Sequence, residues 1–366
     1  MSPIRVLVVD DSVVIRRLVS DVLAGDPAIE VVGTAVNGRL ALAKLDLLTP
    51  DAITMDIEMP EMDGVEAVRQ LRARGSRVPV IMFSTLTERG ATATLDALAA
   101  GASDYVTKPA NLGSVSASME QVRTSLIPRI KALVPRAGPA GVLPGRTPTP
   151  AAAPSPAPLQ LRPPHAGGTP RLVVVGSSTG GPEAVTVLLN ALPTLPVPVA
   201  LVQHMPPVFT RQLAARLDRQ VPYGVVEAEH GMVLQPGRVH VAPGDQHLRV
   251  VSRGGVLTAA LDQGPPENYC RPAVDVLFRS AVEAVGGAVL GVVLTGMGSD
   301  GCKGARVIVD AGGSLVVQDQ ATSVVWGMPG AVATAGLAEE VLPLGEIAPA
   351  VLRRVAGRTS LAGGLR

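Results

Sequence analysis

Short apolar runs alternate with helical patterns along the first 134 residues. The runs RVLVVD, IEVVGTAV, DAITMD, VPVIMFS and DYVTK are rich in β-branched residues and have the length of buried strands. Between the first two, apolar side chains recur at i, i+3, i+4, i+7 and i+8, at Ile15, Leu18, Val19, Val22 and Leu23. That spacing places them on one face of a helix. The alternation predicts a parallel sheet with helices on both faces.

The pattern stops between Pro135 and Pro170, where Pro, Ala and Gly dominate without periodicity. This composition predicts a semi-stiff linker, partly polyproline II, with neither helix nor strand. From residue 171 the alternation resumes, with LVVVG, VPVALVQ, AVLGVVLT and SLVVQD as parallel strands. The run RVHVAPGDQHLRVVSRGGVLTAAL predicts an antiparallel hairpin appended to that sheet. We therefore expect two doubly wound α/β domains, flavodoxin-like over 1–134 and Rossmann-like with an added hairpin over 171–366, joined by a linker over 135–170.

Composition narrows the possible functions. Hydrophobic residues make up 47% of the 366 residues, enough to build two cores. The 32 basic and 31 acidic residues leave a net charge of +1, which gives no field for holding nucleic acid or an anionic membrane. Two cysteines do not make a disulfide framework, and neither a signal peptide nor an apolar run of about 18 residues is present. We expect a cytoplasmic protein without membrane insertion.

Acidic residues follow two strands of the first predicted domain. Asp10 and Asp11 come after the first strand and Asp56 after the third, and the carboxyl ends of parallel strands share one edge. Three carboxylates at one edge need a cation, and oxygen ligands suit Mg²⁺. Asp56 could then attack a phosphoryl donor. Ser84 and Lys108, after the fourth and fifth strands, are placed to bind phosphoryl oxygens.

This region resembles the receiver domain of response regulators over its full length, through VVDDS, MDIEMPEMDG, MFST and TKP. The resemblance implies that Asp56 is phosphorylated by a histidine kinase and that the phosphoryl group pairs with Lys108. It also implies Mg²⁺ bound by Asp11, Asp56 and the Glu58 carbonyl, a switching aromatic at Tyr105, and a cis bond before Pro109.

A serine lies in a glycine-rich turn of the second predicted domain. In LVVVGSSTGGPEAV, Gly176, Ser178 and Gly180 satisfy G-x-S-x-G between a strand and a helix. Glycines permit the tight turn that lifts a hydroxyl above the sheet edge, and the helix N-terminus favours developing negative charge. The motif alone leaves a hydrolase and an anion-binding turn open, although the lysine of a P-loop is absent.

A serine nucleophile needs a base, and His204 is the best placed of five histidines because it follows the strand VPVALVQ. The other four fit less well: His165 in the linker, His240 within a strand as a structural residue, and His230 and His247 beside loops as surface candidates.

The base needs a carboxylate to orient it. Asp300 lies in LTGMGSDG, directly after a buried strand, and the same loop can offer the backbone N–H of Met297 as an oxyanion donor. Asp245, paired with His247, is the alternative, in a poorer position on a hairpin. The order serine, histidine, aspartate departs from that of α/β-hydrolases and points to a separate family.

Residues 171 to about 350 resemble the catalytic domain of chemotaxis-type protein-glutamate methylesterases, the CheB family. The matching segments are GSSTGGPEA, QHMPPVFTRQLAARL, VHVAPGDQHL, RPAVDVLFRSA, LTGMGSDG and VVWGMPGAV. The family's triad falls on Ser178, His204 and Asp300. The small departures are GSST where GAST is commoner, and NYC before RPAVDV where a basic residue is frequent. The resemblance implies hydrolysis of glutamate methyl esters on chemoreceptors and deamidation of receptor glutamines, with no cofactor in the esterase site.

Two other functions are weighed against this one. A DNA-binding output would need a basic recognition helix, and the second domain shows no helix-turn-helix pattern. A methylesterase of a non-chemotactic sensory pathway would carry the same triad. Cys302, two residues after Asp300, is a reactive-thiol candidate but fits a small buried filler better.

Overall fold

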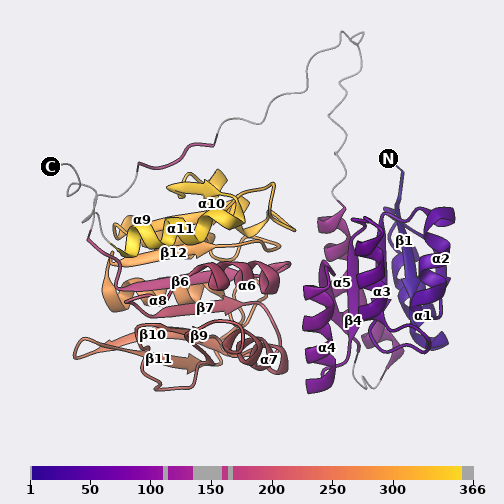
Figure 1. The fold of residues 1–366 in the computed structure, drawn as a ribbon, viewed down its shortest axis with the longest axis horizontal. Helices are drawn as coiled ribbons and strands as arrows, with labels where there is room; N and C mark the ends of the chain where they lie inside the picture. Colours follow the sequence, from indigo (N-terminus) through magenta and orange to yellow (C-terminus); the bar gives the residue numbers. More distant parts are fainter. Residues whose placement is uncertain (1, 110–113, 135–158, 164–167, 357–366) are drawn as a thin grey trace, which may run out of the picture.

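The computed structural model describes residues 2–109, 114–134, 159–163 and 168–356, which form two α/β units (Figure 1). The first unit has a parallel sheet of order β2-β1-β3-β4-β5. Its strands are β1 (Ile4–Val9), β2 (Ile29–Ala35), β3 (Ala52–Asp56), β4 (Val80–Ser84) and β5 (Asp104–Thr107). Its helices are α1 (Val13–Ala24), α2 (Gly38–Leu48), α3 (Gly64–Ala73), α4 (Glu88–Ala99) and α5 (Val115–Leu133). All five expected strands are confirmed.

Apolar packing on both faces holds this sheet. Helices α1 and α5 bury their apolar stripes against one face, and α2, α3 and α4 against the other. Polar caps set where two of the helices begin. The Ser12 side chain accepts a hydrogen bond from the Ile15 N–H at the start of α1, and Asp63 accepts one of 2.8 Å from Glu66 at the start of α3. These caps satisfy N–H groups that the first turn of a helix leaves free.

The second unit has a seven-stranded parallel sheet of order β14-β13-β12-β6-β7-β9-β8. Its strands are β6 (Leu172–Ser177), β7 (Val199–Gln203), β8 (Gly224–Glu227), β9 (Arg238–Val241), β12 (Val289–Val293), β13 (Ser314–Gln318) and β14 (Glu340–Leu342). A separate antiparallel pair is formed by β10 (His247–Arg253) and β11 (Val256–Asp262). The hairpin expectation is therefore half wrong. The RVHV segment joins the main sheet as β9, because all of Val239, His240 and Val241 are buried, as in an internal parallel strand.

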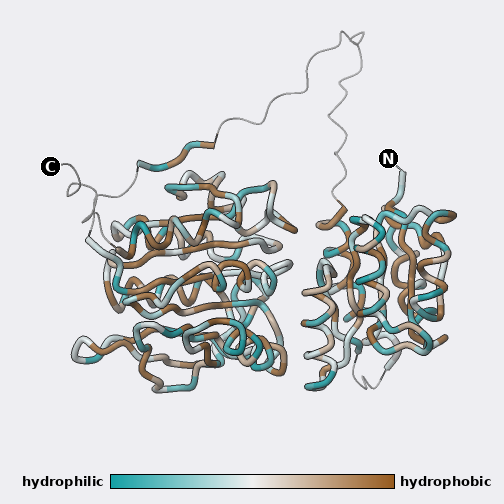
Figure 2. The backbone as a smooth tube through the Cα atoms, viewed as in Figure 1, coloured by the Kyte–Doolittle hydropathy of each residue, from teal (hydrophilic) through white to brown (hydrophobic). Residues whose placement is uncertain are grey.

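Helices and the hairpin cover the two faces of this sheet. One face carries α6 (Gly181–Ala191), α7 (Pro207–Asp218) and α11 (Leu344–Val355). The other carries α8 (Val274–Val285), α9 (Cys302–Asp310), α10 (Met328–Thr334) and the β10–β11 hairpin. Hydrophobic colouring follows the buried central strands in Figure 2. Among the described residues, no helix has both the length and the apolar character needed to cross a bilayer.

Helix α4 of the first unit packs against α6 and α7 of the second, so the two units share an interface (Figure 1). The ring of Tyr105 stacks on that of Phe209, with centroids 4.7 Å apart and an interplanar angle of 11°. Arg216 and Asp96 form an ion pair at the same interface. Of the expected linker, residues 159–163 and 168–170 have neither helix nor strand, and the rest lies outside the described residues.

Candidate active site and phosphoacceptor site

Three neighbouring strands bring the expected triad to one edge of the second sheet. Strand β6 lies between β12 and β7. Ser178 follows β6, His204 follows β7, and Asp300 lies in the loop after β12. The strand that precedes Ser178 therefore lies between the strands that precede His204 and Asp300, and the fold brings these two residues together although 96 residues separate them in the chain.

Glycines allow the turn that carries Ser178. Gly180 has φ of 74°, in the left-handed region, and is the N-cap residue of α6. A Cβ on Gly181 would collide with the side chain of Gln203. Gln203 in turn donates a 2.9 Å hydrogen bond from Nε2 to the Ser178 carbonyl. The turn is thus held from β7, the strand that carries His204.

The loop after β12 approaches the serine closely. A Cβ on Gly296 would lie 2.9 Å from Ser178 Cβ, so only glycine fits there without a shift. The Ser178 N–H donates to the Thr295 carbonyl at 3.0 Å and cannot also serve an oxyanion without breaking that bond. Within the described chain, the next residue of this loop, Met297, donates no backbone hydrogen bond. Its N–H remains a candidate oxyanion donor.

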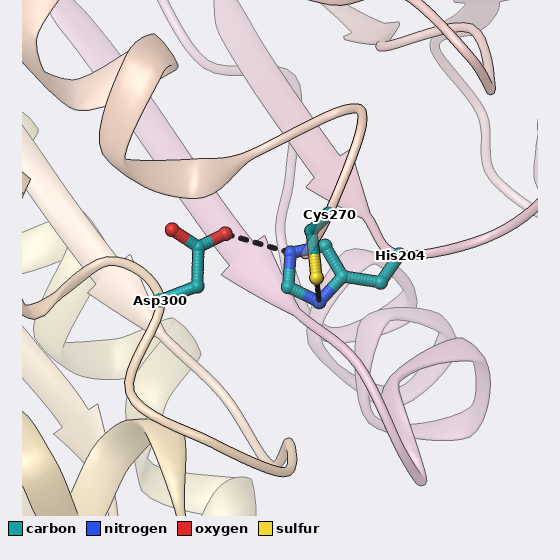
Figure 3. Close-up of side chains that lie close together, drawn as sticks. All are labelled: His204, Cys270 and Asp300. Atoms are coloured by element: carbon teal, nitrogen blue, oxygen red, sulfur yellow. Dashed lines mark hydrogen bonds and ion pairs between the residues drawn. The ribbon is translucent and has the colours of Figure 1, made fainter. Parts of the chain in front are cut away.

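The half-buried His204 and the buried Asp300 form a hydrogen-bonded pair, 2.8 Å between Nε2 and Oδ2 (Figure 3). The same carboxylate accepts from the backbone N–H groups of Val274 at 2.7 Å and Asp275 at 3.1 Å. Burial raises the pKa of Asp300, but the hydrogen bonds from His204 and the two N–H groups outweigh it and lower the pKa below its ordinary value. Asp300 therefore stays ionised and orients the imidazole.

The other ring nitrogen of His204 faces a thiol that the sequence reasoning did not include in the site. Cys270 Sγ lies 3.6 Å from His204 Nδ1 (Figure 3). Burial lowers the pKa of His204, but the hydrogen bond to Asp300 and the contact with Cys270 raise it to about 9. In the described structure, no hydrogen bond joins Ser178 to His204, so the triad is not closed. In the sequence, the feature that could have indicated Cys270 is the NYC segment before RPAVDV, which departs from the family pattern.

Three of the other histidines lie elsewhere, and His165 lies outside the described residues. His230 is exposed, and His240 is buried in β9 with Nδ1 at 3.2 Å from the Val199 carbonyl. The expectation of a surface position for His247 is wrong. It is buried, and its ring nitrogens contact the Pro265 carbonyl at 3.0 Å and the Ala273 N–H at 3.2 Å. Asp245 pairs with Arg271 rather than with His247. No described contact therefore supports the alternative dyad.

Three carboxylates gather at the edge of the first sheet, as the sequence predicted. Ligand oxygens of Asp10, Asp11 and Asp56 lie within 4.8 Å of one another. Lys108 Nζ lies 2.8 Å from Asp56 and 3.1 Å from Asp10. Burial raises the pKa of Asp56 to about 6. The negative charge of Asp10 also raises this pKa, whereas the hydrogen bond and positive charge of Lys108 lower it. Asp10 Oδ2 is buried, and its described polar contact is the 3.1 Å ion pair with Lys108, so three clustered carboxylates face one ammonium group and leave negative charge that a bound cation would balance. The donor set fits Mg²⁺.

The other receiver residues that the sequence singled out make contacts outside the carboxylate cluster. Ser84 is buried and its hydroxyl contacts Thr94 at 2.7 Å. Tyr105 is buried against Phe209 instead of pointing to solvent. The Glu58 side chain lies 3.5 Å from Arg89. The expected cis bond before Pro109 is wrong: among the described peptides only Arg271–Pro272 is cis. A trans bond is the lower-energy form of an X-Pro peptide by about 0.5–1 kcal/mol, and Lys108 reaches Asp56 with it.

The first unit contacts the second beside the nucleophile turn. Thr179, directly after Ser178, donates a buried 2.8 Å hydrogen bond to Asp104 on β5. Asp104 is also 3.1 Å from Arg129 on α5. A cavity of about 440 Å³ lies between the units, lined by His204 and Cys270 on one side and by Tyr105 and Arg129 on the other.

Known proteins match both units. The CheB methylesterase family model matches residues 173–351, and the response regulator receiver domain model matches residues 6–120. A protein-glutamate methylesterase/protein-glutamine glutaminase of Nocardioides sp. is 70% identical over 97% of this chain and 96% of that relative. One of the same name from Trichodesmium erythraeum is 48% identical over 97% and 100%. The solved Thermotoga maritima CheB methylesterase catalytic domain is 42% identical, covers 50% of this chain and 98% of its own, and has a TM-score of 0.49.

Proposed function

This chain belongs to the CheB methylesterase family, and on that premise we propose that it is a phosphorylation-activated protein-glutamate methylesterase and protein-glutamine glutaminase. Its substrates would be the glutamate γ-methyl esters and glutamines of methyl-accepting chemoreceptors. The observation that carries the proposal is the convergence of Ser178 with the hydrogen-bonded pair His204–Asp300 on three adjacent strands. It would act in the cytoplasm, where receptor signalling helices lie.

The proposed reaction begins when the Ser178 hydroxyl attacks the ester carbonyl. His204 accepts the hydroxyl proton at Nδ1, because Nε2 is engaged by Asp300. The Met297 N–H stabilises the oxyanion, and the proton then goes from His204 to the leaving methanol. Water, deprotonated by His204, hydrolyses the acyl-enzyme and leaves free glutamate. With a glutamine side chain the same steps release ammonia.

The chain's own residues would prepare Asp56 for phosphorylation by a histidine kinase. Asp10, Asp11, Asp56 and the Glu58 carbonyl would hold Mg²⁺, which when bound supplies the positive charge that a phosphoryl group needs. Lys108 lies 2.8 Å from Asp56 and, after phosphorylation, would form its ion pair with the phosphoryl oxygens instead. Ser84 would exchange its present hydrogen bonds for one to the phosphoryl group. Tyr105 would change its position at the same time.

The resting interface supports control by occlusion. Receiver residues line the cavity that opens on His204, and Asp104 holds the residue next to the nucleophile. A receptor helix could not enter that space while the units are docked. Phosphorylation would shift the equilibrium toward undocked molecules.

The decisive experiment is methanol release from methyl-labelled receptor membranes by the full chain and its Ser178→Ala variant, with and without a phosphodonor. Loss of a triad nucleophile lowers the rate by ~10⁴–10⁶. Ser252→Ala is the control, because Ser252 is an exposed serine on β10 of the same unit. Normal methanol release by folded Ser178→Ala protein would refute the assignment.

A further inference from the structure

The thiol beside His204 takes part in no bond-making or proton-transfer step of the proposed hydrolysis. Cys270 is half-buried and lines the same cavity as His204. Its sulfur faces Nδ1, the ring nitrogen that Ser178 must reach, while Asp300 binds the other nitrogen (Figure 3). Sulfur, imidazole nitrogen and carboxylate oxygen lie within 4.8 Å of one another. This is a donor set typical of zinc sites.

The separation of the two facing atoms matches one metal ion. Zinc bonds of about 2.3 Å to sulfur and about 2.0 Å to nitrogen, at a tetrahedral angle, put the two ligand atoms about 3.5 Å apart. Cys270 Sγ and His204 Nδ1 are 3.6 Å apart. We propose that Cys270 and His204 form an inhibitory binding site for Zn²⁺, with Asp300 as the outer partner of the imidazole.

The surroundings suit a metal held by two side chains. A carboxylate bonded to the far nitrogen of a zinc-binding histidine fixes the ring and strengthens its donor nitrogen, and Asp300 is in that position at 2.8 Å. The cavity of about 440 Å³ gives the ion a path and leaves room for water as the remaining ligands. On binding, Zn²⁺ replaces the proton of the Cys270 thiol and any proton on Nδ1, and both protons go to solvent.

The consequence for activity rests on the proposed function. A metal on Nδ1 occupies the lone pair that takes the proton of Ser178, so the bound enzyme cannot form its acyl intermediate. The binding itself does not depend on catalysis. Ser178→Ala protein should therefore bind the metal as the parent does, although it hydrolyses nothing.

The experiment uses the full chain, with its receiver Mg²⁺ site saturated, and titrates it with buffered Zn²⁺ and separately with Co²⁺. Co²⁺ bound to a thiolate absorbs in the near ultraviolet, which reports on sulfur coordination without any esterase assay. The variants are Cys270→Ser, Ser178→Ala and, as matched control, Cys302→Ser. Cys302 is the other half-buried cysteine, on α9, and its thiol contacts the Ala331 carbonyl.

We expect one metal per chain at this site, a sulfur-to-cobalt band, and inhibition of methanol release at the same metal concentration. Cys270→Ser should lose the band and weaken binding by at least about 10-fold, the effect of losing even an outer partner. Cys302→Ser and Ser178→Ala should keep the sulfur-to-cobalt band and the parent's affinity for the metal. Metal binding that survives Cys270→Ser, or a band that vanishes with Cys302→Ser, would overturn the site. Binding at Cys270 without inhibition would overturn the inhibitory role, whereas absent esterase activity in metal-free protein would count only against the proposed function.

Discussion

The hydroxyl of Thr179 donates a 2.8 Å hydrogen bond to the carboxylate of Asp104, so a receiver strand holds the residue that follows the nucleophile. Asp104 precedes Tyr105, whose ring stacks on Phe209 of α7. One short stretch of β5 therefore contacts both the nucleophile turn and a helix of the catalytic unit. A change in the position of β5 would reach both at once.

Removing this hydrogen bond should release the catalytic unit. In Asp104→Ala the unphosphorylated protein should hydrolyse receptor esters about 10-fold faster, because a hydrogen bond to a charged group contributes about 1.5–3 kcal/mol. Asp96→Ala is the matched control. It removes an interface carboxylate that is 45% exposed, so its ion pair with Arg216 is screened and the gain should be small. Equal rates for Asp104→Ala and the parent would exclude this restraint. The measurement is methanol release without phosphodonor.

Removing the whole receiver should have a larger effect on large substrates. A fragment starting at Gly168 should exceed the intact, unphosphorylated chain on receptor membranes by up to ~10–100-fold, if the docked state holds ~90–99% of molecules. The gain on a small soluble ester should be less, since steric cover excludes a receptor helix more strongly. Equal gains on both substrates would indicate a triad distorted at rest instead of a covered one.

Phosphorylation should be confined to Asp56 and should need a divalent cation. Acetyl phosphate or another small phosphodonor with Mg²⁺ should label Asp56, detected by borohydride trapping and mass spectrometry. Asp56→Asn should abolish the label. Chelation should do the same, because without a metal ion Lys108 is the one cation that the described structure places against the carboxylates of Asp10, Asp11 and Asp56. A label that persists in chelator would rule out the metal requirement.

The pH dependence of the esterase should report the His204 environment. A base must be neutral, and a pKa of about 9 keeps His204 protonated at lower pH, so resting activity should fall as the pH drops below about 9. In Cys270→Ala the contact that helps raise this pKa is gone, while the hydrogen bond to Asp300 remains. The acid limb should therefore move to lower pH. Rates between pH 6 and 10 test this on metal-free protein, with Cys302→Ser as control. An unmoved limb in Cys270→Ala would contradict the assigned cause.

Local patterns were enough to predict most of the architecture. Alternation of apolar runs and helical stripes indicated both parallel sheets, because period and length are properties of short segments. The G-x-S-x-G turn, the Asp cluster and the Gly-rich LTGMGSDG loop located Ser178, Asp56 and Asp300 at strand ends. In each case the chemistry followed from residues close together in the chain.

Tertiary structure decided which of these groups meet. Strand order is set by packing between distant segments, so only the folded chain shows β6 between β7 and β12, and His204 hydrogen-bonded to Asp300. The same cause explains the wrong expectations. β9 has a hairpin-like sequence but pairs with β7, and His247 lies beside a loop yet is buried. The approach of Cys270 to His204, and of Thr179 to Asp104, depends on contacts between segments 66 and 75 residues apart, which no local pattern encodes.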